Sequence, residues 1–502
     1  MNIHLIWFRN DLRLHDHGPL DATCRAAKAD GGVVLPFYVV DPHWFGDTRF
    51  GFPRMASHRR RFLQESLDDL ATNLRTVGVS LSFLSGSTDK AISRLIETVG
   101  PVSLRFHHEF GVEERAIEQR VVAAAERQGV TCTAFSPSTL LNVEDLPFDI
   151  DDTPEVFTKY RRIVEKNKQK RCQPREPIAA PTSVPSDQET IDQVASLTLN
   201  DAAVEVFSDS SETPRRGDPC VLDFHGGETA GLKRLRDYLW TTDSIARYKE
   251  TRNGMLGIDY SSKFSPWLAN GCVSARQIAA EVSRYENERV ANESTYWMIF
   301  ELLWRDYFAL MVAKHGAAVF QITGLRGQSY PWKQDHPRFE IWAVGQTGFP
   351  LIDANMRELS ATGFMSNRGR QNVGSFLTKN LGIDWRMGAE WFESQLIDYD
   401  PCSNYGNWNY VAGVGNDARG FRWFNTIKQS HNYDAGGSYV RHWCPELTSV
   451  PDQWVHEPWK MSTDQQKQSG CVIGVDYPAP IVDLFQSADH HQRLYEEGDA
   501  HG

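Results

Sequence analysis

The chain has 502 residues, of which 41% are hydrophobic and 24% are charged, a composition typical of a soluble globular protein with two or three domains. Its net charge of −12 argues against broad non-specific binding of nucleic acid, although a local basic groove remains possible. The eight cysteines show no metal-ligand spacing, and no apolar run approaches the ~18 residues of a membrane span. We therefore expect a cytoplasmic protein with reduced thiols, no metal and no membrane partner.

Residues 1–135 alternate short β-rich runs with longer helical patterns. The predicted strands are Ile3–Phe8, Val33–Val40, Val79–Leu84, Val102–His107 and Val130–Phe135. This alternation predicts an α/β domain with a doubly wound parallel sheet. The segment Arg9–Asp16 follows the first strand where a dinucleotide-binding domain would carry G-x-G-x-x-G, so we assign no nicotinamide cofactor.

The rest of the chain predicts three further parts. Residues 136–225 form an interdomain connector, in which we interpret the basic run Lys159–Arg162 as a solvated face. Residues 226–490 show helical spacing nearly throughout, which predicts an all-α domain with its own core. Residues 491–502 are a polar tail.

The segment Asp398–Tyr410 combines carboxylates, amides, aromatic rings and glycine without an apolar face. Pro401 would break a helix running through it, and the common outcome of such a composition is an Asx-rich surface turn. The other interpretation is a wall of a site for a planar, polar ligand. Its position after an apolar helical pattern in a Trp-rich region favours the site.

A second unusual segment, Tyr296–Phe308, is nearly all apolar and yet contains charges. Glu301, Trp304, Arg305 and Phe308 share one helical face. A surface Glu301–Arg305 pair, worth only ~0.3–0.5 kcal/mol, is the simpler explanation. The alternative is that these charges and the indole line an internal cavity, because unpaired burial of either charge is costly.

Four segments resemble the photolyase/cryptochrome family, and its DASH cryptochromes in particular: Trp7–Asp16, Tyr296–Phe308, Phe349–Arg357 and Asp398–Trp408. They follow the family's order and spacing from residue 1 to about residue 484. The resemblance implies an α/β antenna-binding domain and a helical FAD-binding domain, which agrees with the pattern above. It also implies blue-light-driven repair of cyclobutane pyrimidine dimers, as a deoxyribodipyrimidine photo-lyase, by an electron from photoexcited reduced FAD.

The resemblance assigns FAD contacts and electron-transfer residues by position. The implied FAD contacts are Tyr248, Ser261, Ser262, Lys263, Phe264, Ser265, Arg305, Asn367, Arg370, Asp398, Asp400 and Asn404. Asn404 would face flavin N5, where an amide cannot donate a proton as an acid does. The implied electron path is Trp408, Trp385 and Trp332; core packing would otherwise be the favoured role of each.

The same resemblance implies that Glu301 hydrogen-bonds the flipped dimer and that Trp304 stacks on it. Further implied contacts to the lesion or strand are Arg252, Arg305, Asn367, Arg368, Gln371, Tyr405 and Gln429. Gln371, Tyr405 and Met298 differ from ordinary dimer photolyases and match DASH proteins. They make the lesion pocket more polar, consistent with a preference for single-stranded DNA.

The antenna implied by the resemblance is methenyltetrahydrofolate, held by Glu114 and Tyr399. From the sequence alone, Glu114 would be a solvated helix residue. RNA is a further possible partner, and we expect a monomer. The alternative function is a blue-light photoreceptor that binds FAD and nucleic acid without efficient repair.

Overall fold

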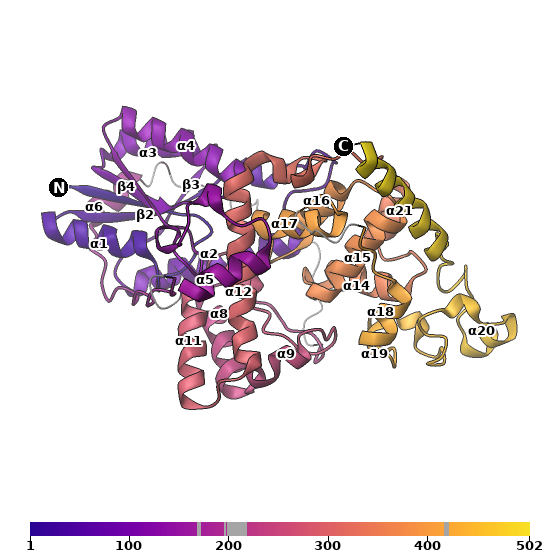
Figure 1. The fold of residues 1–502 in the computed structure, drawn as a ribbon. Coiled ribbons are helices and arrows are strands. Elements are labelled where there is room, and N and C mark those ends of the chain that lie inside the picture. The colour runs from indigo at the N-terminus through magenta and orange to yellow at the C-terminus, as the bar shows by residue number, and fades with distance from the viewer. Residues whose placement is uncertain (168–171, 195–196, 198–217, 416–420, 502) are drawn as a thin grey trace.

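The computed structural model describes residues 1–167, 172–194, 197, 218–415 and 421–501. It contains an N-terminal α/β domain and a C-terminal helical domain joined by a long connector (Figure 1). Residues 198–217 of the predicted connector lie outside the described residues. No helix among the described residues is long and apolar enough to cross a membrane.

The N-terminal domain contains a five-stranded parallel sheet in the order β3-β2-β1-β4-β5. The strands are β1 (Ile3–Phe8), β2 (Val33–Val40), β3 (Ser82–Ser85), β4 (Ser103–His107) and β5 (Thr131–Phe135). Its helices are α1 (Gly18–Asp30), α2 (Ser57–Thr76), α3 (Thr88–Val99) and α4 (Val112–Arg127). This sheet confirms the predicted α/β fold class.

Both faces of the sheet are covered, which explains why β1 and β2 at its centre are mostly apolar. Ile6 and Phe8 of β1 pack in one core cluster with residues of α1 and α2. Leu5 and Trp7, which point to the opposite face, pack in another with residues of α3 and α4. Figure 1 shows α3 and α4 on one side of the sheet and α1 and α2 on the other.

The remaining elements form the connector and the helical domain. The connector contains α5 (Phe157–Asn167) and α6 (Gln188–Val194). The helical domain contains α8 (Glu228–Arg236), α9 (Tyr248–Thr251), α10 (Ser265–Ala269), α11 (Ala275–Glu288), α12 (Glu293–His315), α13 (His336–Ala343), α14 (Pro350–Thr362), α15 (Asn367–Ser375), α16 (Trp385–Gln395), α17 (Pro401–Ala412), α18 (Thr426–Tyr433), α19 (Ser438–Trp443), α20 (Thr463–Ser469) and α21 (Leu484–His501). Single π-helical turns, Asp237–Thr241 and Phe376–Asn380, extend α8 and α15.

The segment Arg9–Asp16 after β1 joins the two domains. The fully buried Arg13 side chain donates to the Gly271 carbonyl at 2.8 Å. The Glu228 carboxylate accepts from the backbone N–H groups of Leu14 and His15, at 2.9 and 3.0 Å. A Cβ at Gly271 would lie 2.0 Å from the Asn10 carbonyl oxygen, so the backbones meet in direct contact there. The segment therefore fixes how the domains sit relative to one another.

The fold decides between the two interpretations of Asp398–Tyr410 and places a helix in the predicted polar tail. Asp398–Tyr410 is not a surface turn, because α17 begins at Pro401 and the Asp400 carboxylate accepts from the Ser403 N–H at 2.7 Å. Pro401 starts the helix because the first helical position needs no N–H donor. The predicted polar tail, 491–502, is largely the second half of α21, where Tyr495 is buried.

Candidate functional site

The first part of the candidate site surrounds Asp398, where α10, α15 and the start of α17 meet. The Asp398 Oδ2 atom accepts from Ser265 Oγ at 2.6 Å and from Arg370 Nη2 at 2.7 Å. The other oxygen, Oδ1, is buried and has no hydrogen-bond partner among the described residues. A buried acceptor without a partner is costly, so this atom is available for a donor on a bound group.

The segment Ser261–Ser265 leads into α10 beside Asp398. Arg234 donates to the Ser262 carbonyl at 3.0 Å and to the Ser261 carbonyl at 3.2 Å, which fixes the loop from one side. Within the described part of the chain, the backbone N–H groups of this segment have no hydrogen-bond acceptor. Free backbone N–H groups at a helix start suit a phosphate.

Lys263 does not present its amine as an open cation. Its Nζ donates to the Gly257 carbonyl at 2.9 Å and lies 4.4 Å from the centre of the Tyr260 ring. Burial lowers the pKa of this amine to about 8, against the opposing effect of Glu358. Tyr248, the other predicted contact on this side, is buried at the start of α9.

Asn404 lies on the first turn of α17, one helical turn beyond Asp400. Its Nδ2 donates to the Ala389 carbonyl of α16 at 3.0 Å. This bond uses one of the two amide N–H donors, and the oxygen remains as an acceptor. The chain thus anchors Asn404 against α16 and leaves its side-chain oxygen available to a bound group.

The second part of the site surrounds Glu301 on α12. The Glu301 carboxylate forms an ion pair with Arg252, which follows α9. The Arg252 guanidinium also lies over the Trp297 ring, 4.7 Å from its centre. The Glu301–Arg305 pair, the simpler of the two explanations from the sequence, does not form, and Arg305 instead donates to the Ser138 carbonyl at 2.7 Å.

Trp304 lies in an aromatic group that includes the connector. Phe157 of α5 stacks on its indole with a centroid separation of 3.7 Å and an angle of 12°. Tyr410 of α17 meets it edge-on at 6.0 Å. Neither neighbour was assigned a role from the sequence. Tyr410 lies in Asp398–Tyr410, where the sequence interpretation favoured a site wall but predicted no helix; helical spacing from Asn404 and Asn407 could have identified it.

Arg368 extends this polar region from α15. It donates to Gln371 and to Asn253, both at 3.0 Å, and it lies 4.6 Å from the centre of the Tyr433 ring. Gln429 lies one turn before Tyr433 on α18, and its Oε1 is buried without a described partner. Asn367 is exposed at the first position of α15.

The three predicted electron-transfer tryptophans lie in one core cluster of the helical domain. Trp385 and Trp408 are buried, and Trp332 is partly buried against the same cluster. Trp385 donates to the Ile322 carbonyl at 3.0 Å, whereas the Nε1 atoms of Trp332 and Trp408 have no described partner. Tyr405 packs edge-on against Trp385 at 6.0 Å, and its ring lies tilted against Phe320 at 4.6 Å.

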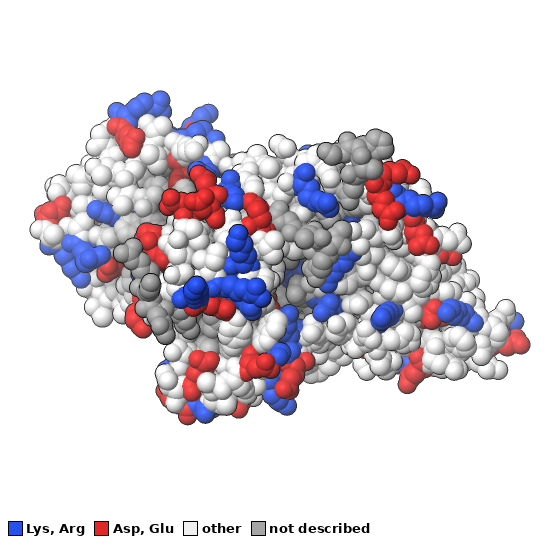
Figure 2. All heavy atoms as spheres, viewed as in Figure 1, with Lys and Arg blue, Asp and Glu red and all other residues white. Residues whose placement is uncertain are grey.

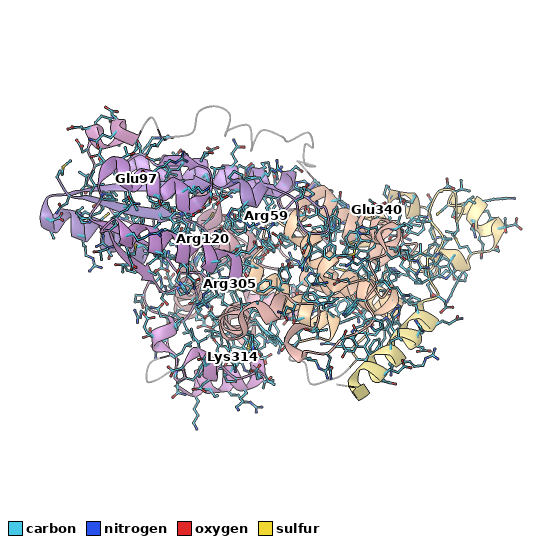
Figure 3. The ribbon with its side chains drawn as sticks, turned by 90° about the horizontal axis from the view of Figure 1, so that it is seen from above. Arg59, Glu97, Arg120, Arg305, Lys314 and Glu340 are labelled. Atoms are coloured by element: carbon cyan, nitrogen blue, oxygen red, sulfur yellow. The ribbon has the colours of Figure 1, made fainter. Side chains whose placement is uncertain are left out.

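A cavity between the two domains brings together Glu114, Tyr399, Asp400 and Arg305. Figure 3 shows Arg59 and Arg305 where the domains meet. The lesion assignment placed Arg305 together with Glu301 and Arg252. In the structure, Arg305 instead lies at the interdomain cavity. The Arg59 guanidinium lies 4.4 Å from the centre of the Tyr399 ring.

Glu114 is buried at this cavity rather than solvated. Burial, with the nearby Glu109 charge, raises the pKa of its carboxyl to about 8. A Cβ at Gly111 would lie 2.0 Å from Glu114 Oε2, so the absence of a side chain there allows the carboxyl its position. Within the described residues, no other side chain hydrogen-bonds to this carboxyl.

Comparisons with known proteins match both domains. Residues 4–182 match the family model described as DNA photolyase, and residues 297–497 match the FAD binding domain of DNA photolyase. The chain is 51% identical over 495 residues to a Cryptochrome DASH of Gloeobacter violaceus, covering 98% of this chain and 95% of the relative. A Synechocystis Cryptochrome DASH is 50% identical, covering 98% of each.

Two solved structures share the architecture. The crystal structure of a Synechocystis cryptochrome matches with a TM-score of 0.92 and 48% identity, covering 98% of this chain and 99% of that one. A bacterial class III photolyase from Agrobacterium tumefaciens matches with a TM-score of 0.83 and 27% identity, covering 99% and 98%.

Proposed function

Because this chain belongs to the photolyase/cryptochrome family, within its DASH cryptochromes, we propose that it repairs cyclobutane pyrimidine dimers in single-stranded DNA under blue light. The observation that carries the proposal is the Glu301 group. A carboxylate paired with Arg252 and an indole edge-on to Tyr410 lie on one helix, where they offer hydrogen bonds and ring faces to a flipped pyrimidine dimer. Photolyases in general flip the damaged bases out of the strand into a pocket, and the energy needed for this is lowest when the strand is unpaired.

FAD is the cofactor that the matched domain takes, and the residues around Asp398 fit it. The free Asp398 Oδ1 atom, Arg370 and the unengaged N–H groups of Ser261–Ser265 would hold the flavin nucleotide. Asn404 would accept a hydrogen bond from a reduced flavin ring. When bound and reduced, the flavin supplies an electron to the dimer under light and receives it back, with no net redox change.

The protein's own residues orient the lesion and exclude water. Glu301 hydrogen-bonds the polar edge of the dimer, and Trp304 and Tyr410 provide aromatic walls. The Arg252–Glu301 pair opens or shares its carboxylate when the lesion enters, since the carboxylate already has a partner. Arg368, held by Asn253 and Gln371, supplies a fixed cation toward the strand.

We also propose that the interdomain cavity holds a folate antenna against Glu114 and Tyr399. The support is chemical: a buried, proton-bearing carboxyl and a tyrosine backed by Arg59 suit a flat, nitrogen-rich ring. Methenyltetrahydrofolate is such a ring system. Trp408, Trp385 and Trp332 serve in the same proposal as the route by which oxidised flavin is reduced.

The test compares Glu301→Gln with wild type in the flavin-bound, pre-reduced state. Under blue light we expect the variant to repair a dimer-containing single strand at least about tenfold more slowly, because one transition-state hydrogen bond is lost. The matched control is Glu293→Gln on the same helix, whose carboxylate pairs with Lys249 at 2.6 Å. Equal repair by all three proteins would contradict the role of Glu301.

A further inference from the structure

The first two turns of α12 present three aromatic rings at the surface. Tyr296 is 39% exposed, and Trp297 and Phe300 are partly exposed. The Trp297 and Phe300 rings lie 4.3 Å apart at 55°, and Tyr296 and Phe300 lie 6.3 Å apart at 54°. We name these three residues the aromatic platform. Clustered exposed aromatics are uncommon on a monomeric surface unless they bind something.

Cations lie on both sides of the platform, and each of them pairs with a carboxylate: Arg252 with Glu301, Lys249 with Glu293 and Arg161 with Glu165. Arg252 lies 4.7 Å and Lys249 lies 5.9 Å from the centre of the Trp297 ring. On the other side, the Arg161 guanidinium of α5 lies 5.5 Å from the centre of the Phe300 ring and donates to the Tyr296 hydroxyl at 3.3 Å. Aromatic rings interleaved with cations suit bases that need stacking and phosphates that need charge.

The neighbouring Arg162 carries an available charge. It is exposed on α5, and within the described residues it forms no ion pair. Figure 2 shows Lys and Arg side chains gathered over α5 and continuing toward α9, against the acidic background of the whole chain. The sequence interpretation of Lys159–Arg162 as a solvated face does not explain why Lys and Arg side chains gather from α5 toward α9.

The platform adjoins the Glu301 group directly. Trp297 and Glu301 are one helical turn apart on α12, and Arg252 contacts both residues. A strand whose lesion reached Glu301 would therefore pass its neighbouring nucleotides over Trp297 and toward α5. In a duplex those neighbouring bases are stacked and paired, so they could not stack on the platform.

We propose that the aromatic platform and α5 bind the unpaired nucleotides flanking the lesion in single-stranded DNA. Their bases stack on Trp297 and Tyr296, and their phosphates contact Arg161 and Arg162. The proposal rests on the proposed function for the identity of the strand. It adds a binding surface outside the lesion pocket and a physical source for single-strand preference.

The test measures binding of undamaged oligothymidylate, single-stranded and annealed to oligodeoxyadenylate, by fluorescence anisotropy with the flavin-bound protein. We expect Trp297→Ala to weaken single-strand binding about tenfold, the loss typical of one stacked base, and to affect the duplex much less. Tyr296→Ala, at a more exposed position, gives the same selective loss if Trp297→Ala folds poorly. Phe485→Ala, at a ring 55% exposed on α21, is the matched control and should bind as wild type.

Charge provides the second readout. Arg162→Gln should lower the salt dependence of binding by about one counterion, whereas Arg25→Gln on α1 should not. Equal losses on single strand and duplex for both aromatic variants, or no loss for either, would overturn the proposal. The binding assay uses undamaged DNA, so its result does not depend on repair. If the wild-type protein repaired no dimers in a separate assay, the proposed function would be refuted, but the strand-binding result would stand.

Discussion

A substitution at Gly388 on α16 tests whether the position of Trp408 controls the supply of electrons to the oxidised flavin. A Cβ at Gly388 would lie 2.2 Å from Trp408 Cη2 and 2.6 Å from Leu377 Cδ2. Ordinary carbon–carbon contacts are about 3.5–4.0 Å, so Gly388→Ala requires the indole to move by more than about 1 Å. Trp408 is 3% exposed and packed edge-on against Phe392 at 5.1 Å, which leaves little room for that movement.

The expected stability cost follows from two opposing effects. Overpacking a core costs about 1–3 kcal/mol, whereas alanine is favoured over glycine in a helix by up to about 1 kcal/mol. We therefore expect Gly388→Ala to lower the free energy of unfolding by about 1–2 kcal/mol. The displaced indole should also slow photoreduction of the oxidised flavin, while chemically reduced protein keeps its repair activity.

Gly374 on α15 gives the matched control, because it approaches the same indole from another helix. Its Cβ would lie 3.4 Å from Trp408 Cζ3 and 3.1 Å from Val411 Cγ1, which requires only a small adjustment. Gly374→Ala should stay within about 0.5 kcal/mol of wild type and photoreduce normally. Urea unfolding and flavin absorbance under blue light measure both quantities. Normal stability and photoreduction in Gly388→Ala would refute the reasoning.

Three further predictions concern the remaining parts of the site. Trp385→Phe should block photoreduction of oxidised flavin but spare repair by pre-reduced protein; photoreduction at the wild-type rate would exclude Trp385 from the path. Asp398→Asn should lower flavin occupancy after purification, because Arg370 and Ser265 lose a charged partner; full occupancy would argue against this group as the flavin anchor. The Glu114 carboxyl titrates near its ordinary pKa when unfolded and has a pKa of about 8 when folded, so the stability it contributes at low pH is lost as pH rises through that range. Glu114→Gln should therefore gain melting temperature over wild type as pH rises from about 5 to about 8, and a constant difference would contradict the assigned burial effect.

The sequence predicted the parts of the fold that depend on local pattern. Strands β1 and β2 are mostly apolar runs followed by helical spacing, and both have the predicted ends. The helix within Asp398–Tyr410 was not predicted, and the reason is local as well. Pro401 was interpreted as a helix breaker, although a proline at the first helical position after an Asp cap starts a helix.

The contacts within the site were harder to predict from the sequence, because they join segments that are distant along the chain. The Glu301 spacing on α12 suggested Arg305 as its partner, but the ion pair forms with Arg252, which local helical spacing cannot identify. Phe157 stacks on Trp304 from the connector, a region that carried only a weak pattern. Similarly, the burial of Glu114 depends on Gly111 and on the approach of the second domain, whereas the helix alone indicates an exposed side chain.

The central claim is light-driven splitting of dimers, and one measurement tests it most directly. Wild-type protein with bound, reduced flavin is mixed with a single-stranded oligonucleotide carrying one cyclobutane pyrimidine dimer, and intact dimer is quantified after darkness or blue light. The account predicts no loss in darkness and several repaired dimers per protein under light, since no net electron is consumed. Binding of the oligonucleotide with no loss of dimer under light would contradict it and would identify a photoreceptor that does not repair.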